Sequence, residues 1–123
     1  MRRSRCVLLF LPTLLFAACT YDKADELAEP AGACDTTNVT YTGTIVPIMI
    51  TRCALPGCHV PGGNGTGDLT TYAGVQNHVL NGKLLAAVQH TTGAIPMPPD
   101  GSMIPMCDIL RISAWIQQGA PNN

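Results

Sequence analysis

The sequence is poor in aromatic and in charged residues. Of its 123 residues, 5% are aromatic and 12% are charged, and only one is tryptophan. A chain of this length with so few large side chains can build only a thin hydrophobic core. Small domains of this kind usually need a disulfide, a metal or another bound group to be stable. The composition therefore predicts one small domain that is held together by more than side-chain packing.

An excess of positive charge is also missing. The chain carries 7 Lys and Arg against 8 Asp and Glu. Three of the basic residues lie among the first five positions, which we expect to be removed with a signal peptide; four basic and eight acidic residues then remain, a formal charge of −4. Without a basic patch to neutralise phosphates, nucleic acid is excluded as a partner. A mild acidic excess is compatible with docking to a basic protein surface and is also common in soluble proteins.

A hydrophobic run long enough for a comfortable membrane span is absent, since the apolar stretch at residues 7–18 is too short. This stretch follows Arg2, Arg3 and Arg5, an arrangement typical of a secretory signal. Its end, Phe16-Ala17-Ala18-Cys19, resembles the lipobox of bacterial lipoproteins. The resemblance implies that residues 1–18 are a signal peptide and that Cys19 carries lipid in the cell envelope. A secreted protein without lipid is the alternative.

The remaining chain divides into a tether and a domain. Residues 19–33 are polar and acidic, and they contain Pro30 and Gly32, which predicts a flexible tether. Residues 34–123 form the expected folded domain. There is no internal repeat, and alternating β-branched runs are few, so we predict an all-α domain of about four short helices.

The helix signals are local. Thr44 can cap a first helix over residues 44–53, with Pro47 in its first turn. The other expected helices are 70–80, capped by Thr70 or Thr71 and ended by Asn81-Gly82; 83–90, ended by Gly93; and 106–118, ended by Gly119 and with Asp108 in its first turn. In the last helix Ile109, Ile112 and Ile116 share one face, and Trp115 is expected in the core. Residues 95–105 contain four prolines and are expected to be irregular.

The most informative segment is Cys53-Ala54-Leu55-Pro56-Gly57-Cys58-His59. Two cysteines with a histidine directly after the second form a c-type haem attachment pattern, here with four residues between the thiols instead of two. Both thiols would add to haem vinyl groups, and the adjacent histidine would then lie under the iron as its proximal ligand. Leu55 to Cys58 suits a type II turn, with proline second and glycine third, which would keep the two sulfurs close despite the longer spacing.

The other cysteines fit an oxidising compartment. Once Cys6 leaves with the signal and Cys19 takes lipid, four cysteines remain, which as a pure disulfide set allow three pairings. If haem takes Cys53 and Cys58, then Cys34 and Cys107 are left as one disulfide pair.

The glycine-rich loop at residues 57–67 contains five glycines. It is not expected to bind phosphate, because no strand precedes it and no Lys-Ser/Thr pair ends it. Two interpretations stay open. The loop passes closely along a haem edge, or it is a surface connection.

These motifs together resemble small monohaem c-type cytochromes of the lipoprotein kind found in Gram-negative envelopes. The resemblance covers residues 34–123. Its segments are Thr44-Ile45-Val46-Pro47-Ile48, Cys53…Cys58-His59, Asp68-Leu69-Thr70-Thr71-Tyr72-Ala73-Gly74-Val75, Met97-Pro98-Pro99 and Trp115-Ile116-Gln117-Gln118-Gly119-Ala120-Pro121. It implies a class I-like cytochrome c domain of about four helices around one covalent haem c. Cys53 and Cys58 would be the thioether donors, His59 the proximal ligand and Met97 the distal ligand.

The residues themselves also favour Met97 as the distal ligand. Prolines on both sides stiffen its loop, which holds a weakly binding thioether in place at low entropy cost. Met103, Met106 and His90 are the alternatives, and a core-filling role for Met97 is another. His78 and His90 are otherwise expected to be polar surface histidines near helix ends.

The function that follows is electron transfer rather than enzyme catalysis, since two filled axial positions leave no place for a substrate on the iron. The expected partners are redox proteins that dock transiently, and the membrane through the lipid anchor. Two alternatives lack haem. One is a disulfide-bonded envelope lipoprotein with a Cys53–Cys58 bridge. The other is a copper or zinc carrier that uses Cys53, Cys58, His59 and Met97.

Overall fold

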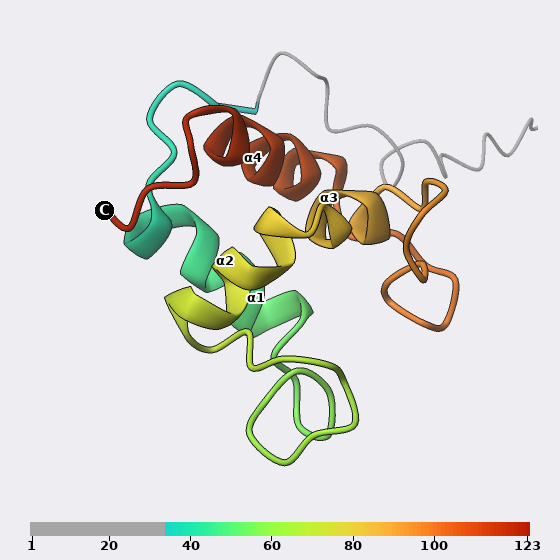
Figure 1. Cartoon of the computed structure of the whole chain (residues 1–123). Coiled ribbons are helices and arrows are strands. Elements are labelled where there is room, and N and C mark those ends of the chain that lie inside the picture. The colour runs from blue at the N-terminus through green and yellow to red at the C-terminus, as the bar shows by residue number, and fades with distance from the viewer. Residues whose placement is uncertain (1–33) are drawn as a thin grey trace, which may run out of the picture.

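Helices account for all the regular secondary structure in the residues that the computed structural model describes, which are 34–123. Along the chain they are the π-helical turn η1 (Tyr41–Ile45) and the α-helices α1 (Val46–Arg52), α2 (Tyr72–Leu80), α3 (Lys83–Val88) and α4 (Met106–Gln117) (Figure 1). Within this part of the chain there is no strand, so the predicted all-α class is confirmed. The expected signal peptide, Cys19 and the tether fall outside the described residues. None of the helices in residues 34–123 is long and apolar enough to cross a membrane.

The first helical segment begins earlier than expected. Thr40, not Thr44, provides the cap, because its hydroxyl accepts a hydrogen bond from the Gly43 N–H at 3.1 Å. The chain then makes the π-helical turn and continues directly into α1, which has no side-chain cap of its own. Pro47 lies in the first turn of α1, as predicted, where its missing N–H leaves no hydrogen bond unmade.

Local signals were sufficient to predict the ends of α2 but not the end of α3. Thr71 caps α2 by accepting from the Gly74 N–H at 3.2 Å, and Asn81 ends it as predicted. Helix α3 is shorter than expected. It ends at Val88, because His90 adopts a left-handed backbone with φ of 54°. The N–H groups of His90 and Thr91 turn back to the Ala87 and Ala86 carbonyls, which is a Schellman ending. The prediction that Gly93 ends this helix is therefore wrong.

Helix α4 matches its prediction to within one residue, with Gln118 as its C-cap. Its buried face consists of Cys107, Ile109, Ile112 and Trp115, whereas Ile116 is only half-buried against the core. Asp108 lies in the first turn, where its charge is favourable, and its carboxylate is 3.2 Å from the Nε of Arg52 at the end of α1. The ion pair is partly exposed, so its contribution to stability is modest, about 0–1 kcal/mol.

Three aromatic rings organise the core where η1 packs against α4. Trp115 is completely buried. Its ring centroid lies 5.7 Å from that of Tyr41 and 6.5 Å from that of Tyr72. The polar ends of two rings hold the C-terminal segment: Trp115 Nε1 donates to the Pro121 carbonyl at 2.9 Å, and the Tyr72 hydroxyl donates to the Ala120 carbonyl at 2.8 Å. Trp115 is thus a core residue, as predicted, and its indole N–H has the partner that a buried donor requires.

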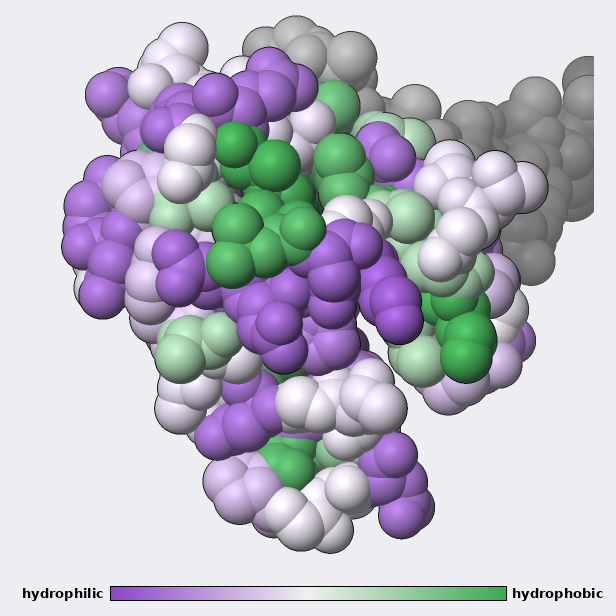
Figure 2. Space-filling view, in the orientation of Figure 1, coloured by the Kyte–Doolittle hydropathy of each residue, from purple (hydrophilic) through white to green (hydrophobic). Residues whose placement is uncertain are grey.

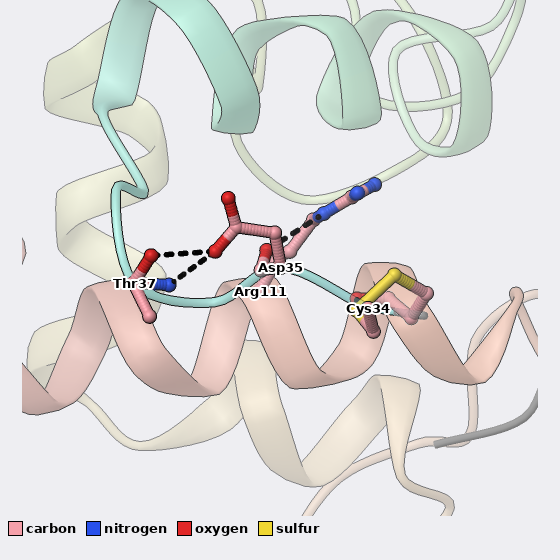
Figure 3. Close-up of a disulfide and its surroundings, with 5 residues drawn as sticks. Cys34, Asp35, Thr37 and Arg111 are labelled. Carbon is pink, nitrogen blue, oxygen red and sulfur yellow. Dashed lines mark hydrogen bonds between the residues drawn. A yellow bond between two sulfur atoms is a disulfide. The ribbon is translucent and has the colours of Figure 1, made fainter. Parts of the chain in front are cut away.

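A disulfide joins Cys34, at the start of the domain, to Cys107 in the first turn of α4 (Figure 3). This confirms the predicted pairing. The segment that follows Cys34 is held on α4 as well, because Arg111 Nε donates to the Asp35 carbonyl at 3.4 Å. The Asp35 carboxylate accepts from the Thr37 N–H at 2.8 Å and from its hydroxyl, and these bonds hold the pKa of Asp35 below its usual value.

Two long irregular segments extend from this helical frame. One, residues 53–71, links α1 to α2 and forms the lowest part of the view in Figure 1; the other, residues 89–105, links α3 to α4 and lies at its right. Only Leu69 in the first segment and Ile104 in the second are buried. These segments carry the residues that the sequence singled out, and they border the cavity described next.

Candidate functional site

Helix α1 delivers Cys53 to the site. Cys53 is the C-cap of α1, and its N–H donates to the Met49 carbonyl at 2.9 Å. Beyond it, the Cys58 N–H donates to the Leu55 carbonyl at 2.9 Å, and Gly57 has a φ of +81°. A hydrogen-bonded turn with a positive φ at its third residue is the type II turn that the Leu55 to Cys58 sequence predicts. The His59 N–H then donates to the Cys53 carbonyl at 3.3 Å, so the seven residues from Cys53 to His59 close into a loop.

His59 is oriented by a backbone carbonyl. Its Nδ1 lies 2.9 Å from the Thr66 carbonyl oxygen. Because a carbonyl oxygen only accepts hydrogen bonds, Nδ1 must carry the ring proton, which leaves Nε2 of a neutral ring free to bind a metal. Metal-binding histidines are commonly held in this way through the nitrogen that does not bind the metal. Gly65 makes room for the ring, since a Cβ there would lie 2.7 Å from His59 Nδ1.

A cavity of about 1010 Å³ lies between the two irregular segments. Its volume is at the upper end of the roughly 300–1,000 Å³ usual for ligand pockets. Figure 2 shows the molecule hollowed between the lobe at the bottom of the view and the lobe at the right. The wall contains Cys53, Cys58, His59 and Met97, and apolar residues from α3 and the adjoining loops form much of the rest.

Met97 comes to the cavity from the second irregular segment and is held at both of its backbone polar groups. Its N–H donates to the Ala87 carbonyl in α3 at 3.0 Å, and its carbonyl accepts from His90 Nε2 at 3.1 Å. The other candidates for a distal ligand lie elsewhere. His90 does not line the cavity, and neither do Met103 and Met106, which are 49% and 59% exposed.

The two cysteines of the site are free thiols, in contrast to Cys34 and Cys107. Burial raises the pKa of Cys53 to about 11, with the Arg52 charge opposing the rise. At neutral pH this thiol is therefore protonated and not the reactive thiolate of a redox enzyme or a metal site. Among the described residues, no three His, Cys, Asp or Glu side chains are grouped so that they could hold a metal ion together.

The cavity wall also contains residues that the sequence did not single out. His78, expected as a surface residue, is half-buried on α2 and faces the site; its Nε2 lies 2.9 Å from the same Thr66 carbonyl that orients His59. No sequence signal marks His78, because the loop that carries Thr66 decides where its ring points. Arg52 and Lys83 are the basic side chains of the wall. The glycine-rich loop contributes Gly57, Asn64, Gly65 and Thr66 to the cavity wall.

Comparisons of the chain with protein-family models, with curated proteins and with solved structures found no match.

Proposed function

We propose that this chain is a monohaem c-type cytochrome that carries electrons in a cell envelope. One observation carries the proposal. The fold brings Met97 to the same cavity as Cys53, Cys58 and His59, although 38 positions separate it from His59 in the sequence. Two thiols, an imidazole and a thioether around one large, mostly apolar cavity are the groups that attach and ligate a c-type haem.

The residues around the cavity suit a c-type haem in three further respects. The Thr66 carbonyl fixes the proton on His59 Nδ1, so that Nε2 is the nitrogen left for iron. Met97 lines the cavity, whereas Met103, Met106 and His90 do not. Lys83 supplies a positive charge on the wall for the carboxylates that haem carries, and Arg52, which also pairs with Asp108, supplies a second.

Cys53 and Cys58 would hold the group covalently. Each S–H adds across one vinyl C=C bond, so that a C–S bond forms, the proton goes to the other vinyl carbon and no oxidant is consumed. Bound haem supplies an iron that takes up and gives back one electron. The protein's own part would be to hold the iron between His59 and Met97, so that no position is left for a substrate, and to exclude water with the apolar wall. This is why we propose an electron carrier and not an enzyme.

The cellular setting belongs to the same proposal. The lipobox-like sequence ending at Cys19 would anchor the domain to a membrane on the periplasmic side or at the cell surface, and residues 19–33 would serve as its tether. Its partners would be redox proteins that dock transiently. The haem-free alternatives have less support, because Cys53 and Cys58 do not form a disulfide and no three His, Cys, Asp or Glu side chains within residues 34–123 are grouped so that they could hold a metal ion.

Covalent haem is the deciding test. The full-length protein, expressed in a bacterium with working haem-attachment machinery, should give a c-type pyridine haemochrome and keep haem through denaturing gel electrophoresis. Replacing Cys53 and Cys58 together by Ala should abolish covalent haem. Each single replacement should leave one thioether and alter the haemochrome spectrum.

The matched control removes the two cysteines of the disulfide. The Cys34→Ala, Cys107→Ala double variant loses the same number of cysteines but none that lines the cavity, so it should keep covalent haem. A colourless wild-type protein would refute the proposal, and bound copper or zinc measured by elemental analysis would then favour the metal carrier.

A further inference from the structure

We infer that His78 is a positioning residue that tunes the proximal ligand through a shared hydrogen-bond acceptor. This inference rests on the proposed function and goes beyond it, because His78 would neither bind the iron nor attach the haem. The observation is the pair of contacts at Thr66. Its carbonyl oxygen lies 2.9 Å from His59 Nδ1 and 2.9 Å from His78 Nε2.

The backbone around Thr66 is built for two rings. Gly65 and Gly67 flank it, and each makes space for one imidazole: a Cβ on Gly65 would lie 2.7 Å from His59 Nδ1, and one on Gly67 would lie 2.5 Å from His78 Nε2. The rings approach edge to face, with centroids 6.2 Å apart. Any side chain at either glycine would collide with a ring, so the Gly65-Thr66-Gly67 sequence permits the double contact.

The shared acceptor has a chemical consequence for His59. A carbonyl oxygen has two lone pairs, so it can accept from both rings at once. Each donor withdraws electron density from the oxygen, which makes it a weaker acceptor for the other donor. A stronger bond at Nδ1 makes a histidine ligand more basic and favours the higher oxidation state of its metal. By occupying part of the acceptor, His78 would weaken the hydrogen bond at His59 Nδ1, reduce electron donation from His59 to a bound iron and so raise the reduction potential.

Helix α2 carries His78, and the side chain makes no other hydrogen bond within the described residues. The His78 ring lines the cavity beside His59. Within residues 34–123 the only hydrogen-bond partner of this side chain is the backbone carbonyl of Thr66. Since the Thr66 carbonyl is also the only partner of His59 Nδ1 in this part of the chain, a change at His78 reaches the iron ligand through a single atom.

The test compares midpoint potentials of the haem-loaded full-length protein. His78→Leu removes the donor and should shift the potential to a more negative value. His78→Gln keeps an N–H donor at the end of the side chain and should restore most of the wild-type value. Asn77→Leu is the control, because it makes the same kind of change at the neighbouring exposed position of α2 and should leave the potential unchanged.

Nuclear magnetic resonance of the two rings supplies a second readout. In the ferrous, diamagnetic protein His59 should carry its proton on Nδ1 and His78 on Nε2, and the His59 Nδ1 proton should move downfield in His78→Leu as its hydrogen bond strengthens. An unchanged or more positive midpoint potential in His78→Leu would overturn the inference. So would a His78→Gln variant whose potential is as negative as that of His78→Leu.

The two proposals fail in different ways. If the wild-type protein binds no haem, the proposed function is wrong. The ring resonances can still be recorded on the haem-free chain, and there the same downfield shift in His78→Leu is expected. Opposite ring tautomers, or no response of His59 to His78→Leu, would then overturn the shared acceptor itself.

Discussion

The side of the molecule around Trp115 and the side around the cavity are held in different ways. Around Trp115, buried side chains from η1, α2 and α4 pack on one another, and a disulfide ties the start of the domain to the first turn of α4. Around the cavity, residues 53–71 and 89–105 contribute only Leu69 and Ile104 to the buried core and are held largely by backbone hydrogen bonds and turns. The first side is complete as a protein core, whereas the second has the construction expected of a binding site that its ligand completes.

The largest expected effect on stability comes from disrupting the packed side around Trp115. Trp115→Ala removes the largest fully buried side chain and should lower the free energy of unfolding by about 3–5 kcal/mol, measured by denaturant titration. Trp115→Phe keeps an aromatic ring and loses the hydrogen bond to Pro121, so its cost should be clearly smaller. Covalent haem should persist in both, since Trp115 does not line the cavity.

The disulfide should contribute on a similar scale. Cys34 and Cys107 are 73 positions apart, so the Cys34→Ala, Cys107→Ala double variant should lose roughly 4 kcal/mol by the chain-entropy model. Reducing the wild-type disulfide should produce a similar loss in thermal or denaturant unfolding. A double variant as stable as the wild type would show that packing alone holds this side together.

The cavity side should respond most to its ligand. In the Cys53→Ala, Cys58→Ala variant, hydrogen exchange should accelerate at amides of residues 53–71 and 89–105, while α4 stays protected. The physical reason is that these segments have few buried contacts of their own. Uniformly faster exchange across both sides would contradict the comparison, because it would mean that the haem supports the whole domain.

A finer prediction separates Met97 from its neighbours. Met97→Ala should remove the weak near-infrared band of a sulfur–iron bond and lower the reduction potential, because a thioether ligand raises it, while covalent haem remains. Met103→Ala and Met106→Ala should leave the band in place, since both side chains are largely exposed outside the cavity. Loss of the band in either of these variants instead would assign the distal position to that residue.

The smallest expected effect concerns the Cys53 thiol in protein produced without attached haem. Burial raises its pKa from 9.0 to about 11, so Cys53 should resist iodoacetamide until the pH approaches 11. The unfolded chain would lose this proton first, so the contribution to stability is full below pH 9 and is lost as the pH rises to about 11. Alkylation followed by mass spectrometry measures the first effect, and unfolding at several pH values measures the second. Rapid alkylation of Cys53 at neutral pH would contradict the burial of this thiol.

Local chemistry in the sequence was enough to predict much of the helical frame. Proline and glycine predicted the Leu55 to Cys58 turn, and threonine and glycine predicted the ends of α2. The apolar spacing predicted α4 and the burial of Ile109 and Ile112, but Ile116 is only half-buried. The start of the first helix was not predicted, because Thr40 and not Thr44 is its N-cap. The end of α3 was not predicted, because His90 adopts a left-handed backbone conformation that residues other than glycine seldom adopt.

Some features of the candidate site could also be predicted from the sequence, and others could not. The sequence by itself determined the Cys…Cys-His order and the turn between the thiols, since both depend on neighbouring residues. Only the tertiary structure brought Met97 to the cavity, left Met103 and Met106 outside it, and joined His59 to His78 through Thr66. The physical reason is that these relations depend on where two long irregular segments lie. Their placement rests on backbone hydrogen bonds such as those from the Leu69 N–H to the His59 carbonyl and from the Met97 N–H to the Ala87 carbonyl, which no local residue pattern predicts.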